Sequence, residues 1–537
     1  MKNNRIPKMN CVLIVLFALF SVQCATKKLG HQNTKKKNLL FIITDQQQYK
    51  ALSIAGNTVL KTPNLDRMAK SGAYFKNAYT PMAVCGPARS CILTGNTVEN
   101  TGVNTNEKTY FYDKEPVMTM PTFDEILAEN GYHCEYYGKW HVMTSHSMIY
   151  KNPKRNSKNG KSIFQHGGQN HVYMDYINEH YPKKELKQGE LYDTFTKRPY
   201  KTDPIDRYHG MDAEELDVKS PPRSQPDLHG ELMIPAEHSF TAYQAKETID
   251  AIERLKDSTF SITLSVHLPH APMLPTAPYY NMYPAKDMIP PASIMDDMEN
   301  SPYKKANGRM GKPEYSDPEK IKYMISNYYG LITEIDDWMG KIFDKLDEHG
   351  LTENTLVIFT SDHGEMLGAH GLREKNVFYE ESAHIPLLIS LPGDIDKNTV
   401  VDGYVSNVDL FSTILDYLNI GEFPSDGKSL RGLIEGTDQV HGKYVVTEWD
   451  YRGDVSPNYM IVKDGWKMII PYSTTSKVID ALYNLNEDPH EMNNLIGKNP
   501  EKAIQKAKVE ELRSCLLEWL QKNKSTHYEG VKNRVLI

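Results

Sequence analysis

Cysteine is scarce in this chain of 537 residues: there are six, and two of them, Cys11 and Cys24, precede the first predicted strand. The other four show no CxxC spacing, which argues against a structural zinc site and a disulfide scaffold. A G-x-S-x-G motif is also lacking, so a serine hydrolase triad has no support. Basic residues are not in excess, since 62 Lys and Arg face 69 Asp and Glu, for a net charge of −7. This balance argues against a nucleic-acid partner.

Long apolar runs are lacking as well. The early run Cys11–Phe20 is too short to span a bilayer, and it lies between basic residues and a Ser-Val-Gln-Cys stretch that ends at Cys24. This arrangement resembles a bacterial lipoprotein signal, with Cys24 as the lipidated residue and simple secretion as the alternative. We therefore expect a signal peptide at 1–24, a polar tether at 25–37, and an exported protein, periplasmic or on the cell surface and anchored to the membrane by lipid.

The rest of the chain has the pattern of an α/β protein. From Asn38 onward, short apolar runs alternate with amphipathic helices, which predicts a large mixed, mainly parallel sheet sandwiched by helices. Periodicity fades over 145–232, a stretch that is either disordered or builds a binding surface. The last part is strand-rich and ends in a helix. We expect an N-terminal catalytic domain at 38–430 and a smaller C-terminal α+β subdomain at 431–537.

Polar residues cluster directly after predicted strands. In open α/β sheets ligands bind at the carboxyl ends of the strands, so these clusters are expected to converge on one site. A single aspartate after a strand is more often a turn former or helix cap, but the repetition of the pattern favours a site. The clusters are Asp45-Gln46, Gly138-Lys139-Trp140-His141, His267-Leu268-Pro269-His270 and Ser361-Asp362-His363-Gly364.

The residue types in these clusters indicate a metal-assisted reaction on an anion. Two carboxylates, an amide oxygen and an imidazole suit one divalent cation, and the oxygen-rich set favours calcium or magnesium over zinc. Lys139 and Lys375 supply positive charge for a group that gains negative charge during reaction. His141 and His270 are candidates for proton transfer near neutral pH.

The most specific motif is the stretch from Cys85 to Gly95, CGPARSCILTG. It resembles the hallmark of the formylglycine-dependent (type I) sulfatases of the alkaline phosphatase superfamily, in which Cys-x-Pro-x-Arg is followed by Leu-Thr-Gly. The polar clusters occur in the family's order, and the segment from Leu482 to Leu495 resembles the family's C-terminal motif. The resemblance, closest to bacterial carbohydrate sulfatases, covers nearly all of the chain after Asn38 and implies an alkaline-phosphatase-like fold.

The resemblance implies a role for each site residue. Cys85 would be converted by a separate maturation enzyme to formylglycine, whose hydrate attacks sulfur with one oxygen and later expels sulfate with the other. Arg89 and His141 would orient the hydrate, Lys139 and Lys375 would hold sulfate oxygens, and His270 would protonate the leaving alkoxide. The metal ligands, for Ca²⁺ with Mg²⁺ as the alternative, would be Asp45, Gln46, Cys85, Asp362 and His363.

The expected substrate is a sulfated saccharide, a glycan or one of its fragments. His370 and Arg373 follow the last cluster and are candidates to bind it, as are Trp449 and Arg452 in the C-terminal part. Two alternatives stay open from sequence: a phosphonate or phosphate ester hydrolase of the same superfamily, and a glycan-binding lipoprotein that has lost catalysis. The complete set of catalytic residue types argues against the second alternative.

Overall fold

The computed structural model describes residues 36–106, 118–142, 228–232, 234–303, 313–438, 440–449 and 456–536, together with short pieces between 157 and 200. Residues 37–537 form one compact unit. The expected signal peptide and its Cys24 lie outside the described residues. Within the described part, none of the helices has the length and apolar character needed to cross a membrane.

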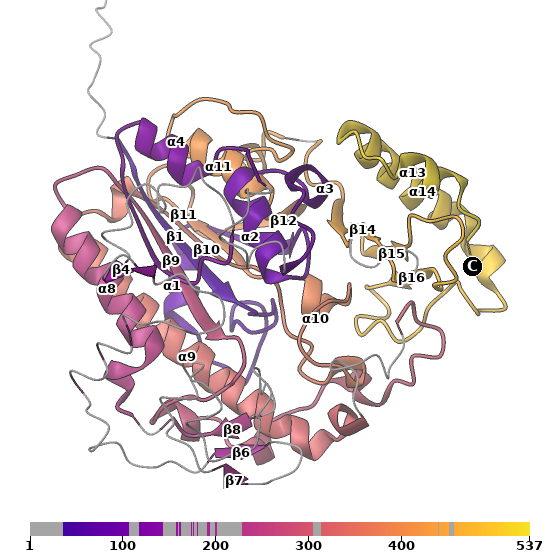
Figure 1. Ribbon diagram of the computed structural model, residues 1–537, viewed down its shortest axis with the longest axis horizontal. Coiled ribbons are helices and arrows are strands. Elements are labelled where there is room, and N and C mark those ends of the chain that lie inside the picture. The colour runs from indigo at the N-terminus through magenta and orange to yellow at the C-terminus, as the bar shows by residue number, and fades with distance from the viewer. Residues whose placement is uncertain are drawn as a thin grey trace, which may run out of the picture. The chain divides into compact units, whose positions relative to one another are not determined.

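A seven-stranded sheet forms the centre of this unit, with strand order β12-β2-β11-β10-β1-β9-β3 (Figure 1). Only β11 runs antiparallel to its neighbours. The sheet is therefore mixed and mainly parallel, as predicted. Its strands are β1 (Asn38–Asp45), β2 (Ala73–Tyr79), β3 (His133–Gly138), β9 (Phe260–Pro269), β10 (Thr355–Ser361), β11 (Leu387–Ser390) and β12 (Thr399–Ser406).

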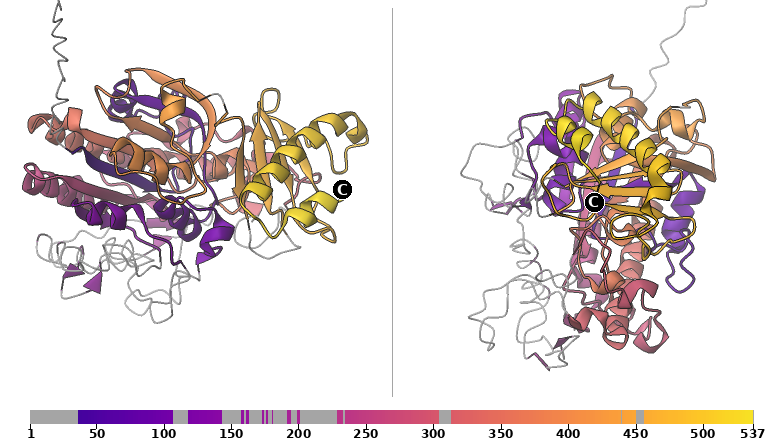
Figure 2. Two further views of the ribbon diagram at one scale, coloured as in Figure 1. Left: turned by 90° about the horizontal axis from the view of Figure 1, so that it is seen from above. Right: turned by 90° about the vertical axis from the view of Figure 1, so that its right-hand side faces the viewer.

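Helices cover both faces of this sheet (Figure 2). One group that packs together is α1 (Pro63–Lys70), α8 (Phe240–Leu255) and α9 (Pro318–Glu348); the other is α2 (Cys85–Thr94), α4 (Phe123–Glu129) and α11 (Asp409–Tyr417). The chain moves along the sheet in one direction through α1, α8 and α9 and in the other direction through α2 and α4, and right-handed crossovers then place the two groups on opposite faces. Shorter helices are α3 (Val98–Thr101), α10 (Glu380–Ala383) and α12 (Arg431–Ile434).

The strands and helices follow from local sequence. β1, with the sequence NLLFIITD, is buried along its whole length, as expected for a central parallel strand. Pro63 lies in the first turn of α1, where its missing N–H costs no hydrogen bond. Thr122 is the N-cap of α4 as its sequence pattern predicts, but its side chain makes no capping hydrogen bond.

A second, antiparallel sheet lies in the C-terminal part, with strand order β13-β14-β15-β16. α13 (Lys506–Lys522) and α14 (Tyr528–Asn533) contribute apolar side chains to a core shared with this sheet, and Figure 2 shows both helices beside it. This small α+β layer agrees with the predicted fold class, whereas the boundary at 430 stays a prediction. The strands are β13 (Val445–Glu448), β14 (Tyr459–Lys463), β15 (Trp466–Ile470) and β16 (Ala481–Asn484).

Short strands within residues 157–230 pair in two small sheets, which the sequence pattern did not predict. They are β4 (Ser157–Lys158) with β5 (Lys161–Ser162), and β6 (Leu191–Asp193) with β7 (Pro199–Tyr200) and β8 (Leu228–Gly230).

Candidate active site

The predicted polar clusters lie at one edge of the large sheet. β1, β3, β9 and β10 are parallel, so their carboxyl ends meet at the same edge. Asp45 is the last residue of β1, Lys139 follows β3 directly, and His270 follows β9. Cys85 comes to this edge from another direction, as the first residue of α2. The N-terminal end of a helix favours a negative charge, which suits a reactive thiolate or an anionic substrate there.

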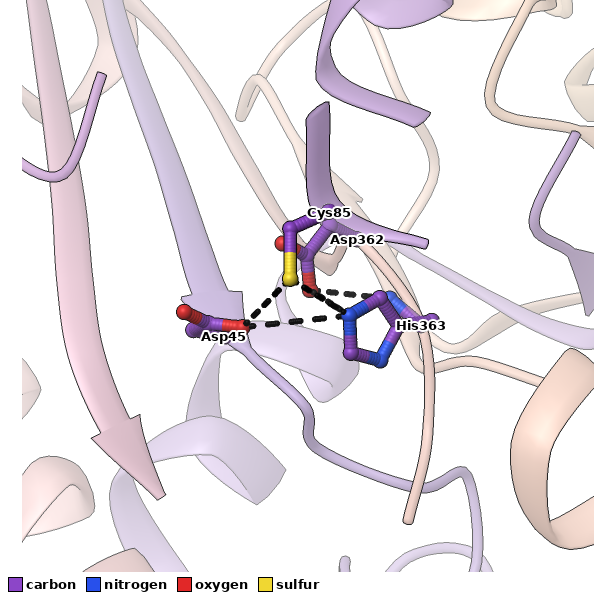
Figure 3. Close-up of side chains that lie close together, drawn as sticks. All are labelled: Asp45, Cys85, Asp362 and His363. Atoms are coloured by element: carbon purple, nitrogen blue, oxygen red, sulfur yellow. Dashed lines mark hydrogen bonds and ion pairs between the residues drawn. The ribbon is translucent and has the colours of Figure 1, made fainter. Parts of the chain in front are cut away.

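Four buried side chains, those of Asp45, Cys85, Asp362 and His363, converge at this edge (Figure 3). One ligand atom from each lies within 4.8 Å of the others. The sulfur of Cys85 lies 3.1 Å from Nε2 of His363 and 3.7 Å from Oδ1 of Asp45. Nε2 of His363 lies 3.6 Å from Oδ1 of Asp362. All four residues were predicted from the sequence to be metal ligands.

Each carboxylate of this cluster divides its oxygens between a cationic side chain and the shared centre. Oδ2 of Asp45 accepts a hydrogen bond from Lys139, and Oδ2 of Asp362 accepts one from Nε of Arg89 at 2.8 Å. Their Oδ1 atoms are the ones close to His363. Nδ1 of His363 bonds the carbonyl oxygen of Gly364 at 3.0 Å, which assigns the N–H to Nδ1 and leaves the Nε2 lone pair facing the centre. Two oxygens and one nitrogen thus fit a divalent cation beside Cys85.

The charges of the cluster stabilise one another. Burial alone would raise the pKa of Asp45, but Lys139 and other cationic neighbours hold that pKa well below its ordinary value. Burial alone would lower the pKa of Lys139, and the Asp45 carboxylate instead raises it. Burial also opposes ionisation of Cys85, yet Lys139 and Lys375 lower the pKa of its thiol. The site is built to hold negative charge at Cys85 and positive charge around it.

Arg89 fixes the geometry of the site from within α2. Its Nη1 donates to the carbonyl oxygen of Lys139 at 3.0 Å and to the hydroxyl of Ser265 at 2.7 Å, in addition to the bond to Asp362. Ser265 in turn donates to the same Lys139 carbonyl at 2.7 Å. Arg89 therefore connects α2 to the interior of β9 and to the ends of β3 and β10.

A hydrogen-bonded row adjoins the cluster and contains Gln46, Lys375 and His270. Lys375 donates from Nζ to Oε1 of Gln46 and, at 3.2 Å, to Nε2 of His270. Nδ1 of His270 donates to the carbonyl oxygen of Ala271 at 2.7 Å, and the Lys375 ammonium, which can only donate, requires a lone pair on Nε2, so this imidazole is neutral. Burial, with Lys375 nearby, holds the pKa of His270 well below its ordinary value. The amide oxygen of Gln46, a predicted metal ligand, thus faces an ammonium group in this structure.

The remaining predicted residues that the structure describes have internal positions. His141 is buried two residues beyond Lys139, with a left-handed backbone at φ 56°. His370 is buried, bonds Oδ2 of Asp296 at 2.7 Å through Nδ1, and stacks on Tyr379. Buried Arg373 lies over the ring of Tyr315. Trp449 belongs to a buried apolar cluster that contains side chains of both the large sheet and the C-terminal sheet. Arg452 lies outside the described residues.

Two residues of the site were missed by sequence reasoning. Ser265 contacts both Arg89 and Lys139, as described above. Glu365 is completely buried and bonds the side chain of Gln46. Glu365 could have been predicted as a site residue from the sequence, because it lies only two residues after His363. Ser265 lies inside an apolar strand, where a serine is usually a packing residue, so its sequence context carried no signal.

Comparison with known proteins supports the same family. The Sulfatase family model matches residues 37–420, and the model for the C-terminal part of N-sulphoglucosamine sulphohydrolase matches residues 368–517. An arylsulfatase of Clostridium perfringens is 29% identical over 506 residues, covering 93% of this chain and 97% of the relative. An N-acetylglucosamine-6-O-sulfatase of Bacteroides thetaiotaomicron is 27% identical over 551 residues, covering 98% and 93%.

Solved structures share the fold. One is a protein in complex with its substrate D-glucosamine-2-N,6-O-disulfate, with a TM-score of 0.65, 23% identity, and coverage of 91% of this chain and 98% of that one. Another is a phosphonate monoester hydrolase of Agrobacterium radiobacter, with a TM-score of 0.69, 22% identity, and coverage of 90% and 96%. The family model, which matches well over half of the residues, shows that the chain belongs to the sulfatase family and is a sulfuric ester hydrolase.

Proposed function

We propose that this protein hydrolyses sulfate esters on a carbohydrate and that Cys85, converted to formylglycine, is its nucleophile. The observation that carries the proposal is the convergence of Cys85 with two carboxylates and an imidazole, beside buried Lys139 and Arg89. Formylglycine supplies a hydrated aldehyde that serves as nucleophile and then releases sulfate by itself. In the structure the Cys85 thiol stands for the unmodified precursor of that group.

The chain's own residues account for binding and proton transfer in this proposal. Lys139 and Lys375 direct positive charge at the space beside Cys85, where sulfate oxygens gain charge during reaction. His270 carries a proton to the leaving oxygen, because a sugar alkoxide is a poor leaving group. The Lys375 ammonium donates a hydrogen bond to its Nε2, so the proton held between these two nitrogens is the one that the leaving oxygen takes, and Lys375 is then left neutral. Arg89 holds Asp362 and the end of β3 in place.

The substrate class is proposed from the relatives. An N-acetylglucosamine-6-O-sulfatase aligns over nearly the whole chain, and a structure that shares the fold holds a sulfated glucosamine. We therefore propose a sulfated saccharide as substrate, and a 6-sulfated amino sugar as the first compound to test. His370, Arg373, Trp449 and Arg452 stay candidates for saccharide binding, and the first three would have to give up internal contacts to reach a sugar.

The test is release of inorganic sulfate from a panel of 6-, 4-, 3- and 2-sulfated mono- and disaccharides. The protein is produced with a maturation enzyme, and Cys85→Ala is the control. We expect sulfate from at least one sugar and none from the control. Activity on phenyl phosphonate esters with none on any sulfate would favour the phosphonate hydrolase alternative, and no activity of a converted protein on either class would favour a binding protein.

We propose Ca²⁺ as the bound cation, with Mg²⁺ as the alternative. Two aspartate oxygens and one imidazole nitrogen are an oxygen-rich ligand set. A ligand at about 100 times its Kd adds about 2.7 kcal/mol to the free energy of unfolding. Chelation should therefore lower Tm, and added Ca²⁺ should restore it better than Mg²⁺. Equal Tm with and without chelator would contradict a bound cation.

We also propose that the protein is exported and held at a membrane by lipid on Cys24. The basis is the short apolar run Cys11–Phe20, which is followed by Ser-Val-Gln and then Cys24. Metabolic labelling with a fatty acid, with Cys24→Ala as control, tests it. Labelling that persists in the variant, or no labelling of the wild type, would leave simple secretion as the explanation.

A further inference from the structure

The buried carboxylate of Glu365 contacts the proposed catalytic groups only indirectly, through the side chain of Gln46. It follows His363 by two residues and is 0% exposed. Its Oε1 accepts backbone N–H groups of Glu374 at 2.6 Å and Leu367 at 3.2 Å, and its Oε2 accepts Nε2 of Gln46. Among the described residues it has no ion-pair partner. A buried charge without a counter-ion is costly, so its three N–H donors must stabilise it.

Gln46 connects this carboxylate to the reaction centre. Its side-chain amide donates to Glu365 from Nε2 and accepts from Lys375 at Oε1. A carboxylate can only accept and an ammonium can only donate, so both contacts require the same orientation of the amide. The backbone of Gln46 is also fixed: its N–H donates to Oδ1 of Asp362 at 3.1 Å, and its carbonyl accepts from Tyr328 at 2.7 Å.

Donors and acceptors match at every step along the row from Gln46 to His270. Gln46 holds one N–H of the Lys375 ammonium, His270 takes a second at 3.2 Å, and Nδ1 of His270 donates to the Ala271 carbonyl. If the amide of Gln46 turned over, its NH₂ group would face the ammonium and repel it. Glu365 is the residue that prevents this reversal. Two side chains, Gln46 and Lys375, thus connect Glu365 to His270, and each has only one arrangement of donors and acceptors that fits its neighbours.

We propose that Glu365 is a positioning residue, which orients the Gln46 amide and thereby holds Lys375 against His270 for protonation of the leaving group. This inference rests on the proposed function, because it assigns Lys375 and His270 to that step. The alternative role for Glu365 is purely structural: its carboxylate would only stabilise the loop 365–374 through the backbone N–H groups that it accepts. A loop support would act equally on every substrate, whereas a positioning residue acts most on substrates whose leaving group needs a proton.

The test uses full-length, matured protein and two probes, 4-nitrophenyl sulfate and phenyl sulfate, whose leaving groups differ in basicity. Glu365→Gln keeps the shape and one acceptor for the loop N–H groups but presents NH₂ to Gln46. We expect kcat for phenyl sulfate to fall at least about 10-fold more than kcat for 4-nitrophenyl sulfate. The matched control is Glu334→Gln, another buried carboxylate, which lies on α9 and accepts a hydrogen bond from Ser239; it should leave the ratio of the two rates unchanged.

A rescue variant makes the test specific. Gln46→Glu alone sets two carboxylates against each other and should also lose activity. The double variant Gln46→Glu with Glu365→Gln exchanges acid and amide, restores each donor and acceptor, and keeps the net charge. It should recover most of the lost rate ratio. Mass spectrometry of the Cys85 peptide and far-UV circular dichroism verify equal conversion and folding in all variants.

The outcomes separate two failures. Equal losses with both probes in Glu365→Gln, or no recovery in the double variant, would overturn the positioning role while the proposed function stands. A converted wild-type protein without activity on any sulfate ester would overturn the proposed function and this inference with it.

Discussion

At the scale of single residues, the site depends on how each polar side chain divides its atoms. Asp45 and Asp362 each pair one oxygen with a cationic side chain and direct the other at the centre shared with Cys85. The sequence predicted which residue types meet, because carboxylates and histidines follow parallel strands. It did not predict that Gln46 would face Lys375, since its left-handed backbone, φ 74°, is set by tertiary contacts.

Glu448 gives a pH-dependent prediction at this scale. Burial raises its pKa to about 8, although the backbone N–H of Val98 donates to it at 2.8 Å. Because the folded-state pKa lies above the unfolded one, about 4.3, this carboxyl favours folding at low pH and its contribution is lost as pH rises from about 4.5 to 8. In that range the loss approaches about 1.4 kcal/mol per pH unit.

Glu448→Gln should therefore flatten this part of the stability curve and be more stable than wild type at pH 8. Urea denaturation from pH 5 to 8 measures it, with exposed Glu501→Gln as the control. Parallel curves for wild type and Glu448→Gln would contradict the prediction.

At the scale of elements, the ends of strands carry the function. The strands predicted to precede the four polar clusters are confirmed as β1, β3, β9 and β10, because buried parallel strands are continuous apolar runs. The short strands between 157 and 230 were not predicted. They are two or three residues long and lie in a polar stretch, where no periodicity can develop.

The end of β3 has a strict steric requirement. Gly138, at φ +105°, precedes Lys139, and a Cβ there would come within 1.9 Å of the carbonyl oxygen of Ser265. Gly393, at φ +95°, has nothing within 4 Å of such a Cβ. Backbone strain of about 1–2 kcal/mol is common to alanine at both positions.

Gly138→Ala should consequently lose much more stability than Gly393→Ala, and most of its sulfatase activity, because Lys139 and β9 are pushed apart. Chemical denaturation and sulfate release measure the two effects. Similar losses in the two variants would show that the close approach of β3 to β9 is not needed.

At the scale of the whole compact unit, a buried ion network links the catalytic part to the C-terminal sheet. Lys467 on β15 contacts Glu380 of α10 at 2.7 Å and Glu491 at 2.9 Å, and its side chain is 0% exposed. Glu380 also bonds His384, which stacks between Tyr49 and Tyr79. His384 thus has a structural role in this network. This long-range pairing had no local signal in the sequence.

Lys467→Met should lower the free energy of unfolding by about 3–5 kcal/mol, because it leaves buried carboxylates without their cation. The exposed pair of Lys498 with Glu299 is the control, and Lys498→Met should cost about 1 kcal/mol or less. Guanidinium denaturation measures both. A loss in Lys467→Met no larger than in the control would mean that the network adds nothing to the attachment of the two sheets.

The central claim is that Cys85 becomes the nucleophile of a sulfatase. The most direct measurement is the mass of the tryptic peptide 77–89 from protein purified from its natural host or co-produced with a maturation enzyme. We predict a peptide that is lighter than the thiol form by the mass of H₂S less that of an oxygen atom. The fraction of this lighter peptide should be proportional to the sulfatase activity of the sample. An unmodified thiol in a sample that hydrolyses sulfate esters at full rate would contradict it.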